Sequence, residues 1–135
     1  MRIRKTVAGL LGALLLASTP LPASADGFSF TFEWGDIPLC TSGYPNSVTN
    51  PIFTVNNVPE GTIKIFFKLK DRNAMQFDHG GGSVKYAGQN VIGPGAFDYK
   101  QPCPPSGSHT YEWTAQAKAP GFKTLAEAKA SKKYP

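Results

Sequence analysis

The sequence of 135 residues predicts an all-β fold, a compact antiparallel β-sandwich with one disulfide bond. Apolar and polar residues alternate in several short segments, as they do in strands that bury one face. Glycine and proline separate these segments, which favours a sandwich or barrel over other fold classes. Two cysteines lie far apart in the chain and could form a disulfide that stabilises a small core.

Residues 1–25 have the pattern of a secretory signal peptide. Three cations precede an apolar run at 7–17, and Ala23-Ser24-Ala25 supplies the small residues of a cleavage site. The run is about 11 residues long, against about 20 for a helix that spans a bilayer, so we expect no transmembrane segment in the mature chain. We expect a single β domain over residues 26–135, exported to the periplasm or outside the cell.

The first segment after the leader shows the clearest strand pattern. Phe28, Phe30, Phe32 and Trp34 alternate with polar or small residues and form one apolar face. Further strands are expected at 52–55, 63–69, 83–86 and 111–119, with turns at 58–61 and 93–95.

The C-terminal residues 124–130 fit two structures. A capping box from Thr124 to Glu127 would begin a helix. Alternation after the Pro120-Gly121 turn would instead form a returning hairpin strand, and we favour the strand.

Cys40 and Cys103 are expected to form a disulfide, because an exported chain leaves the reducing compartment. Closing a loop of roughly 60 residues should stabilise the fold by about 4 kcal/mol through the entropy of the unfolded chain. The wide spacing lacks the CxxC pattern and argues against a redox role.

The charge of the chain argues against a nucleic-acid partner. Three of the 14 basic residues lie in the leader, so the formal charge falls from +5 to +2 when residues 1–25 are removed. Binding to nucleic acid needs clustered cations that displace counterions from phosphate. Lys64, Lys68, Lys70 and Arg72 form a local basic run, which we interpret as the solvent-facing side of a strand.

The two histidines mark the candidate site. His109 follows Pro102-Cys103-Pro104-Pro105, a loop that proline makes rigid. Two interpretations stay open: a binding site formed before the ligand arrives, or a corner between strands that His109 caps. His79 precedes three glycines, which we interpret as a flexible turn that positions His79 at a rim, because no helix follows to complete a phosphate loop.

These segments resemble the phosphatidylethanolamine-binding protein family, and its bacterial Raf-kinase-inhibitor-like, phospholipid-binding branch looks closest. The resemblance runs through Val58-Pro59-Glu60-Gly61-Thr62, an apolar strand that ends in Asp71, a histidine, and the segment at 102–111. It covers roughly residues 40–113, and its most specific part is the PCPPSG-H-Y run. Residues 26–135 would then be a short, divergent domain of this type.

The resemblance implies a β-sandwich with a small anion pocket for a phosphate-like or phospholipid head group. The residues that match the family's motifs, and so are implied to bind the ligand, are Asp71, His79, Pro104, Pro105, His109 and Tyr111. Imidazoles and a phenol can donate hydrogen bonds to phosphate oxygens, and a nearby carboxylate orients an imidazole.

The sequence departs from the family at three places. Its DPDxP motif reads Asp71-Arg72-Asn73-Ala74-Met75 here, glycine follows His79 where an aromatic residue is usual, and Thr110 replaces the arginine of HRY. We interpret Arg72 as an exposed residue at a strand end rather than as a replacement cation.

We expect a binding protein and not an enzyme. His79 and His109 lie 30 residues apart without HExxH spacing, and the chain lacks a GxSxG motif. We therefore expect no catalytic residue, no metal ion and no cofactor. The expected partner is a small anionic ligand or phospholipid head group; the alternative is a secreted or periplasmic interaction or inhibitor module with a vestigial pocket.

Overall fold

The computed structural model describes residues 9, 12–13 and 27–135. The expected signal peptide falls almost entirely outside these residues and stays a prediction. The strands are β1 (Ser29–Glu33), β2 (Ser47–Thr49), β3 (Ile52–Asn56), β4 (Lys64–Asp71), β5 (Gly81–Lys85), β6 (Val91–Ile92), β7 (Asp98–Lys100), β8 (His109–Lys118) and β9 (Thr124–Tyr134). A short 3-10 turn, η2 (Pro120–Phe122), connects β8 to β9. None of the described segments is a helix of the length and hydropathy needed to cross a bilayer.

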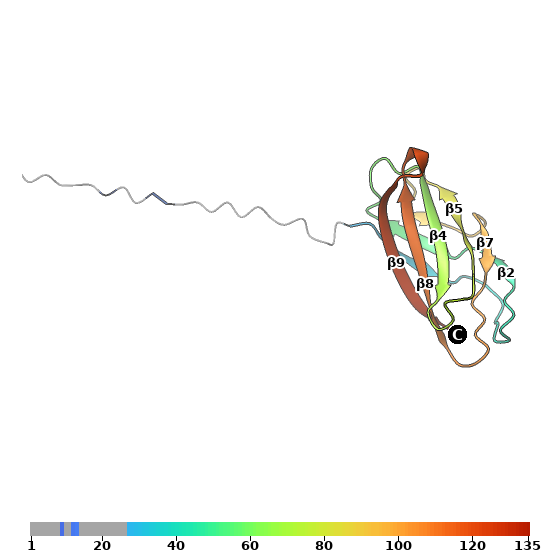
Figure 1. Ribbon diagram of the computed structural model, residues 1–135. Coiled ribbons are helices and arrows are strands. Elements are labelled where there is room, and N and C mark those ends of the chain that lie inside the picture. The colour runs from blue at the N-terminus through green and yellow to red at the C-terminus, as the bar shows by residue number, and fades with distance from the viewer. Residues whose placement is uncertain (1–8, 10–11, 14–26) are drawn as a thin grey trace, which may run out of the picture.

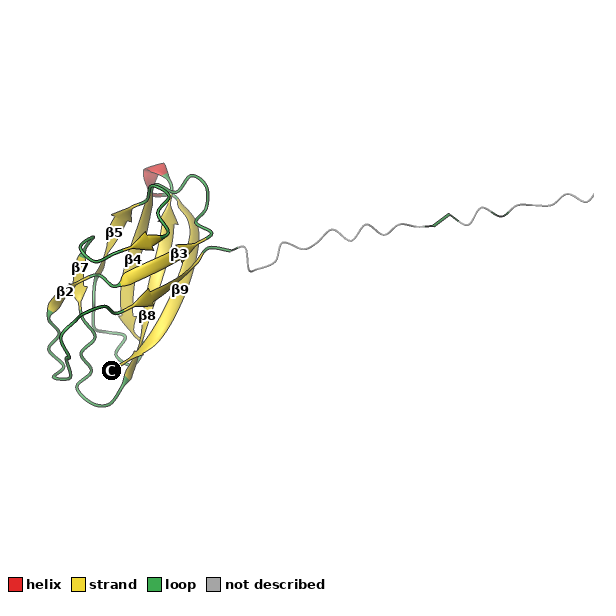
Figure 2. Cartoon of the chain, turned by 180° about the vertical axis from the view of Figure 1, so that it is seen from behind, coloured by secondary structure: helices red, strands yellow, loops and turns green. Residues whose placement is uncertain are grey.

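Two antiparallel sheets pack face to face. One sheet has the strand order β5-β4-β8-β9, the other has the order β1-β3-β6, and β2 pairs with β7 in a separate ribbon. Figure 1 looks onto the four-stranded sheet, and Figure 2 shows the same layers from behind, with β3 crossing in front of β4 and β8. The predicted β-sandwich is confirmed.

The core fills the space between the two sheets with aromatic rings. On β4, Ile65, Phe67 and Leu69 are buried, and the residues between them face solvent. Phe53 of the facing sheet stacks on Phe67 with ring centroids 4.0 Å apart, and the Phe53 and Trp113 rings are nearly perpendicular with centroids 5.3 Å apart. Aromatic side chains bury large apolar areas, so these contacts hold the two layers together. The interpretation of the lysines on β4 as a solvent-facing side is confirmed.

The longer strands lie where the alternation predicts them. The segments predicted at 28–34, 52–55, 63–69, 83–86 and 111–119 correspond to β1, β3, β4, β5 and β8. The C-terminal residues form strand β9 and not a helix, since they pair with β8 from His109 opposite Tyr134 to Lys118 opposite Thr124. The strands β2, β6 and β7 have at most three residues each, which is too short for a sequence pattern.

The predicted disulfide between Cys40 and Cys103 is confirmed. It joins the loop after β1 to the proline-rich loop before β8. The buried Gln101 strengthens this junction, because its side chain accepts a hydrogen bond from Asn46 Nδ2 at 2.9 Å and donates one to the Pro38 carbonyl at 2.6 Å. Two loops that are distant in sequence therefore form one wall beside the sheet.

The glycines after His79 are not a flexible turn, and that interpretation is wrong. Gly81 and Gly82 belong to β5 and pair with Lys68 and Phe67 of β4. A Cβ atom on Gly82 would lie 2.5 Å from the Phe97 side chain, and one on Gly81 would collide with the backbone carbonyl of Phe67. Glycine is needed here because neighbouring groups approach the backbone closely.

This close approach predicts that Gly81→Ala destabilises the fold more than Gly93→Ala does. Overpacking against a backbone group should lower the free energy of unfolding by about 2 kcal/mol or more. Gly93 has open space around its Cβ position and no positive φ, so its change to alanine should cost less than about 1 kcal/mol. Denaturant unfolding of both variants measures the difference, and equal stabilities would contradict the packing described for Gly81.

Candidate ligand-binding site

The candidate site lies where β4 ends and β8 begins. Antiparallel pairing sets Asp71 opposite Tyr111 at this edge of the sheet. Asp71 is buried, and its Oδ2 accepts a hydrogen bond from His109 Nδ1 at 2.6 Å. Its Oδ1 accepts a second bond from the backbone N–H of Asn73 at 2.8 Å. Strand pairing thus brings a carboxylate, an imidazole and a phenol together.

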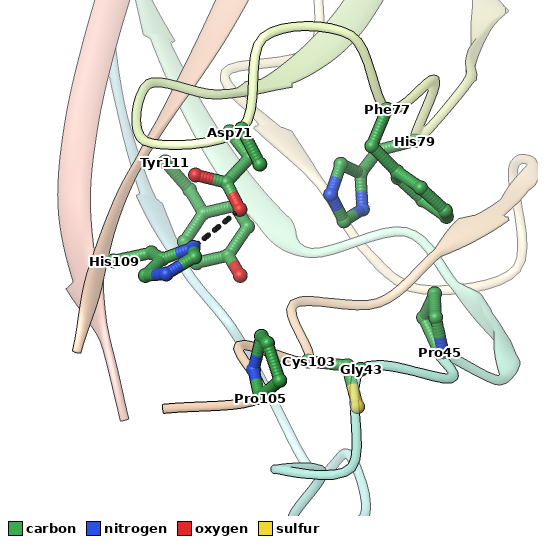
Figure 3. A pocket seen from close by; sticks show the side chains of 10 residues that line it. Gly43, Pro45, Asp71, Phe77, His79, Cys103, Pro105, His109 and Tyr111 are labelled. Atoms are coloured by element: carbon green, nitrogen blue, oxygen red, sulfur yellow. Dashed lines mark hydrogen bonds and ion pairs between the residues drawn. The ribbon is translucent and has the colours of Figure 1, made fainter. Parts of the chain in front are cut away.

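A cavity of about 210 Å³ opens beside these side chains (Figure 3). Five of the six sequence-predicted residues line it: Asp71, His79, Pro105, His109 and Tyr111. Pro104 is buried in the loop and is not among the lining residues. Sites for drug-sized ligands usually have about 300 to 1,000 Å³, so this cavity suits a smaller chemical group.

His79 is buried at the inner side of the cavity and not at a rim, since only 3% of its surface is exposed. Its Nδ1 donates a hydrogen bond to the Lys100 carbonyl at 2.8 Å, and its own carbonyl accepts one from the Lys100 N–H at 2.8 Å. Burial lowers the pKa of His79 and outweighs the Lys100 hydrogen bond and the charge of Asp71. The neutral ring therefore carries its proton on Nδ1, which leaves Nε2 as an acceptor.

Tyr111 lies between the two imidazoles. Its ring centroid is 5.4 Å from that of His79 and 6.3 Å from that of His109. The Tyr111 hydroxyl points into the space between both imidazoles and Pro105 (Figure 3). It is buried and makes no hydrogen bond of ordinary length to the described residues, although the Cys103 backbone and the Asp71 carboxyl lie near enough to affect its pKa. Burial, with a smaller effect of Asp71, raises the pKa of Tyr111 far above its usual range, so the phenol stays neutral and keeps its proton.

Both imidazoles use the same nitrogen to bond the protein. Nδ1 of His79 donates to a carbonyl and Nδ1 of His109 donates to a carboxylate. Protonation of either ring would therefore add a donor at Nε2. No group of three or more His, Cys, Asp or Glu side chains in the described part of the chain is arranged to hold a metal ion.

Sequence analysis did not identify several residues that complete the cavity. The lining residues outside the predicted ligand set are Gly43, Pro45, Ala74, Phe77 and Cys103. The Phe77 ring contacts the His79 ring edge at a centroid distance of 4.6 Å, so the aromatic partner comes before the histidine and not after it. Phe77 could have been found as the aromatic residue nearest His79. Gly43 could not be identified from the sequence, because its role depends on a residue distant in the chain. The Pro105 ring approaches the Gly43 backbone so closely that a Cβ atom at position 43 would lie 3.2 Å from Pro105 Cβ.

The altered motif after Asp71 still holds the strand end in place. Asn73 Oδ1 accepts a hydrogen bond from the Thr110 N–H at 2.8 Å, and the Arg72 N–H donates to the Thr110 carbonyl at 2.8 Å. The Arg72 side chain is exposed, lies 3.5 Å from Glu112, and does not line the cavity. It is the strand-end residue that the sequence indicated.

Comparison with known proteins supports the fold. No family model and no curated protein matches the chain. Among solved structures, the chain is similar to a phosphatidylethanolamine-binding protein homologue from Chlamydia trachomatis, with a TM-score of 0.58 and 14% sequence identity. The similarity covers 82% of this chain and 98% of that chain. The protein therefore has a fold like that of phosphatidylethanolamine-binding proteins, and the resemblance noted in the sequence is confirmed at the level of the fold.

The lowered pKa of His79 predicts a pH dependence of stability. In the unfolded chain His79 takes up a proton near pH 6.5, and in the folded protein it does so only at lower pH. Its contribution to stability is therefore complete above about pH 6.5 and is lost as the pH falls below that value. Denaturant unfolding at a series of pH values should show this loss in the parent protein and in His109→Gln, but not in His79→Gln. If the free energy of unfolding of His79→Gln falls with pH as steeply as that of the parent protein, His79 is not the source of the pH dependence.

Proposed function

We propose that the protein binds a small anion, a phosphate-like group such as a phospholipid head group, in the cavity between His79 and His109. The observation that supports this most is the Tyr111 hydroxyl, which is buried in the cavity without a hydrogen-bond partner among the described residues. A buried donor without a partner costs about 1–3 kcal/mol. A ligand oxygen that reaches this solvent-inaccessible hydroxyl would remove the cost, and an anionic oxygen would form the stronger bond.

The two imidazoles suit an anion whose binding is accompanied by proton uptake. Each ring already donates its Nδ1 hydrogen to the protein, so only Nε2 is available to a ligand. A protonated phosphate oxygen can donate to a neutral Nε2, and a deprotonated oxygen can accept from a protonated ring. Asp71 faces the His109 ring and balances its charge when it is protonated. Anion binding is then coupled to proton uptake.

The size and lining of the cavity fit a head group rather than a whole lipid. Its volume of about 210 Å³ is small, and Phe77 and Pro105 add apolar surface beside the polar groups. The phosphate-like end would contact Tyr111 and the imidazoles, and the carbon atoms attached to it would contact Phe77. The wall formed by the disulfide and the proline-rich loop keeps this shape in the absence of ligand.

The proposal is for an exported binding protein without catalytic activity. Neither imidazole bonds a serine, threonine or cysteine side chain within residues 27–135, as an activated nucleophile would require. The disulfide is compatible with a periplasmic or extracellular protein, because such bonds persist in oxidising compartments.

The test is an NMR titration with inorganic phosphate and phosphoethanolamine that follows the rings of His79 and His109 at fixed pH. Saturable shifts in both rings are expected. Tyr111→Phe should weaken the affinity about tenfold or more, because a hydrogen bond to a charged group is worth about 1.5–3 kcal/mol. It should lower the free energy of unfolding of the free protein only slightly, since the hydroxyl makes no hydrogen bond of ordinary length to the described residues.

Tyr99→Phe is the matched control. Tyr99 is also buried and its hydroxyl also has no hydrogen-bond partner among the described residues, but it does not line the cavity. Its variant should bind the anions like the parent protein. Histidine rings that do not respond to either anion would reject the proposal and favour the interaction or inhibitor module with a vestigial pocket.

A further inference from the structure

The outer face of the four-stranded sheet carries a concentration of lysines that the linear sequence does not reveal. Cross-strand pairing aligns Lys85, Lys64 and Lys118 in one row across β5, β4 and β8. A second row aligns Lys68 with Thr114 and Lys129. The lysines that project from this face are Lys64, Lys68, Lys70, Lys85, Lys118, Lys129 and Lys133. We call this surface the lysine face; it is the side of the sheet seen in Figure 1.

The positive charge of this face is only partly balanced locally, where Lys68 Nζ lies 3.9 Å from the carboxylate of Asp78. Only two acids, Glu112 and Glu127, belong to the same face of the described sheet. Glu112 lies beside Arg72 at 3.5 Å, and Glu127 accepts a hydrogen bond from Gln116 at 2.8 Å. Seven lysines and Arg72, against Glu112, Glu127 and Asp78, give this one surface an excess of about five positive charges, although residues 26–135 as a whole carry only +2.

Exposed aromatic side chains accompany these lysines. Phe66 lies in the middle of the face and is 39% exposed, and Phe122 in η2 is 79% exposed. Lys64 Nζ lies 5.8 Å from the centroid of the Phe122 ring. Phe122 also has a φ of 64°, a left-handed conformation that is unfavourable for a bulky residue. Backbone strain that holds an apolar ring in solvent points to a role outside the fold.

We propose that the lysine face, together with Phe66 and Phe122, docks on the surface of an anionic phospholipid bilayer. Lysines near such a surface are attracted by its negative potential. Lysine is a point charge on a flexible stem, so a field of lysines suits a diffuse layer of anionic head groups better than a single fixed phosphate. Exposed phenylalanines can enter the boundary between head groups and acyl chains. The disulfide indicates an oxidising compartment, where a membrane surface is an available polyanion.

Docking through this surface leaves the ligand cavity free. The cavity lies where β4 ends and β8 begins, whereas η2 follows the other end of β8, at the top of the sheet in Figure 1. The two surfaces therefore use different side chains, and membrane docking does not depend on the proposed anion site.

The test is co-sedimentation of the disulfide-bonded full chain with vesicles of phosphatidylcholine alone and of phosphatidylcholine mixed with phosphatidylglycerol. Because residues 1–26 are identical in all variants, differences between variants report on the substituted side chains. Binding should require phosphatidylglycerol and should weaken as the salt concentration rises above about 0.1 M. The triple variant Lys70→Gln, Lys129→Gln, Lys133→Gln should lower the partition coefficient roughly a hundredfold.

Two further variants separate docking from general effects on charge and folding. Lys129→Gln should weaken vesicle binding more than its matched control Lys100→Gln, since Lys100 is an exposed strand lysine on β7, outside the lysine face. Phe122→Gly should weaken binding without lowering the thermal unfolding midpoint, because glycine adopts a positive φ without strain.

Several outcomes would overturn the proposal. One is equal binding to vesicles with and without phosphatidylglycerol, and another is a triple variant that binds like the parent chain. Tighter binding to double-stranded DNA than to the anionic vesicles at the same salt would make the face a nucleic-acid interface instead. Loss of vesicle binding in His109→Ala would place the lipid contact in the cavity, which would reject docking through the lysine face and leave the anion site in place.

Discussion

Eight consecutive residues of β4 pair with β8 without a break, from Lys64 opposite Lys118 to Asp71 opposite Tyr111. This pairing fixes the side on which each residue lies, because neighbouring side chains of a strand point to opposite faces. Phe67 and Trp113 then face the second sheet, and the lysines face solvent. A register shift of one residue would exchange the two sets. The aromatic core, the basic outer surface and the position of the cavity all follow from this one constraint.

The cavity combines two kinds of support. The end of the β4–β8 pair supplies Asp71, His109 and Tyr111, which are held by regular strand hydrogen bonds. The opposite wall consists of loops with little regular structure, and these are fixed by the disulfide and by Gln101. Polar groups on a rigid strand end can keep a set geometry before a ligand arrives, so little ordering is required on binding.

The sequence predicted the longer strands and the sandwich because alternation over five or more residues reports which face is buried. It also placed Asp71, His79, Pro105, His109 and Tyr111 among the candidate residues, and these line one cavity. It could not predict β2, β6 and β7, which are set by partners distant in the chain. The close approach of Gly81 and Gly82 to β4 and Phe97 was missed for the same reason, as was the joining of lysines from four strands on one face.

The paired hydrogen bonds between His79 and Lys100 have a consequence for how this site can change over time. One residue fastens β7 to the residues before β5 and also presents its ring to the cavity. Substitutions at position 79 should therefore alter both folding and the proposed ligand binding, whereas removal of the Tyr111 hydroxyl should alter mainly the proposed ligand binding. During selection for a new ligand, the Tyr111 phenol and Phe77 could therefore be substituted with less loss of stability than His79. A library that varies position 79 would be depleted of folded members before any binding is scored.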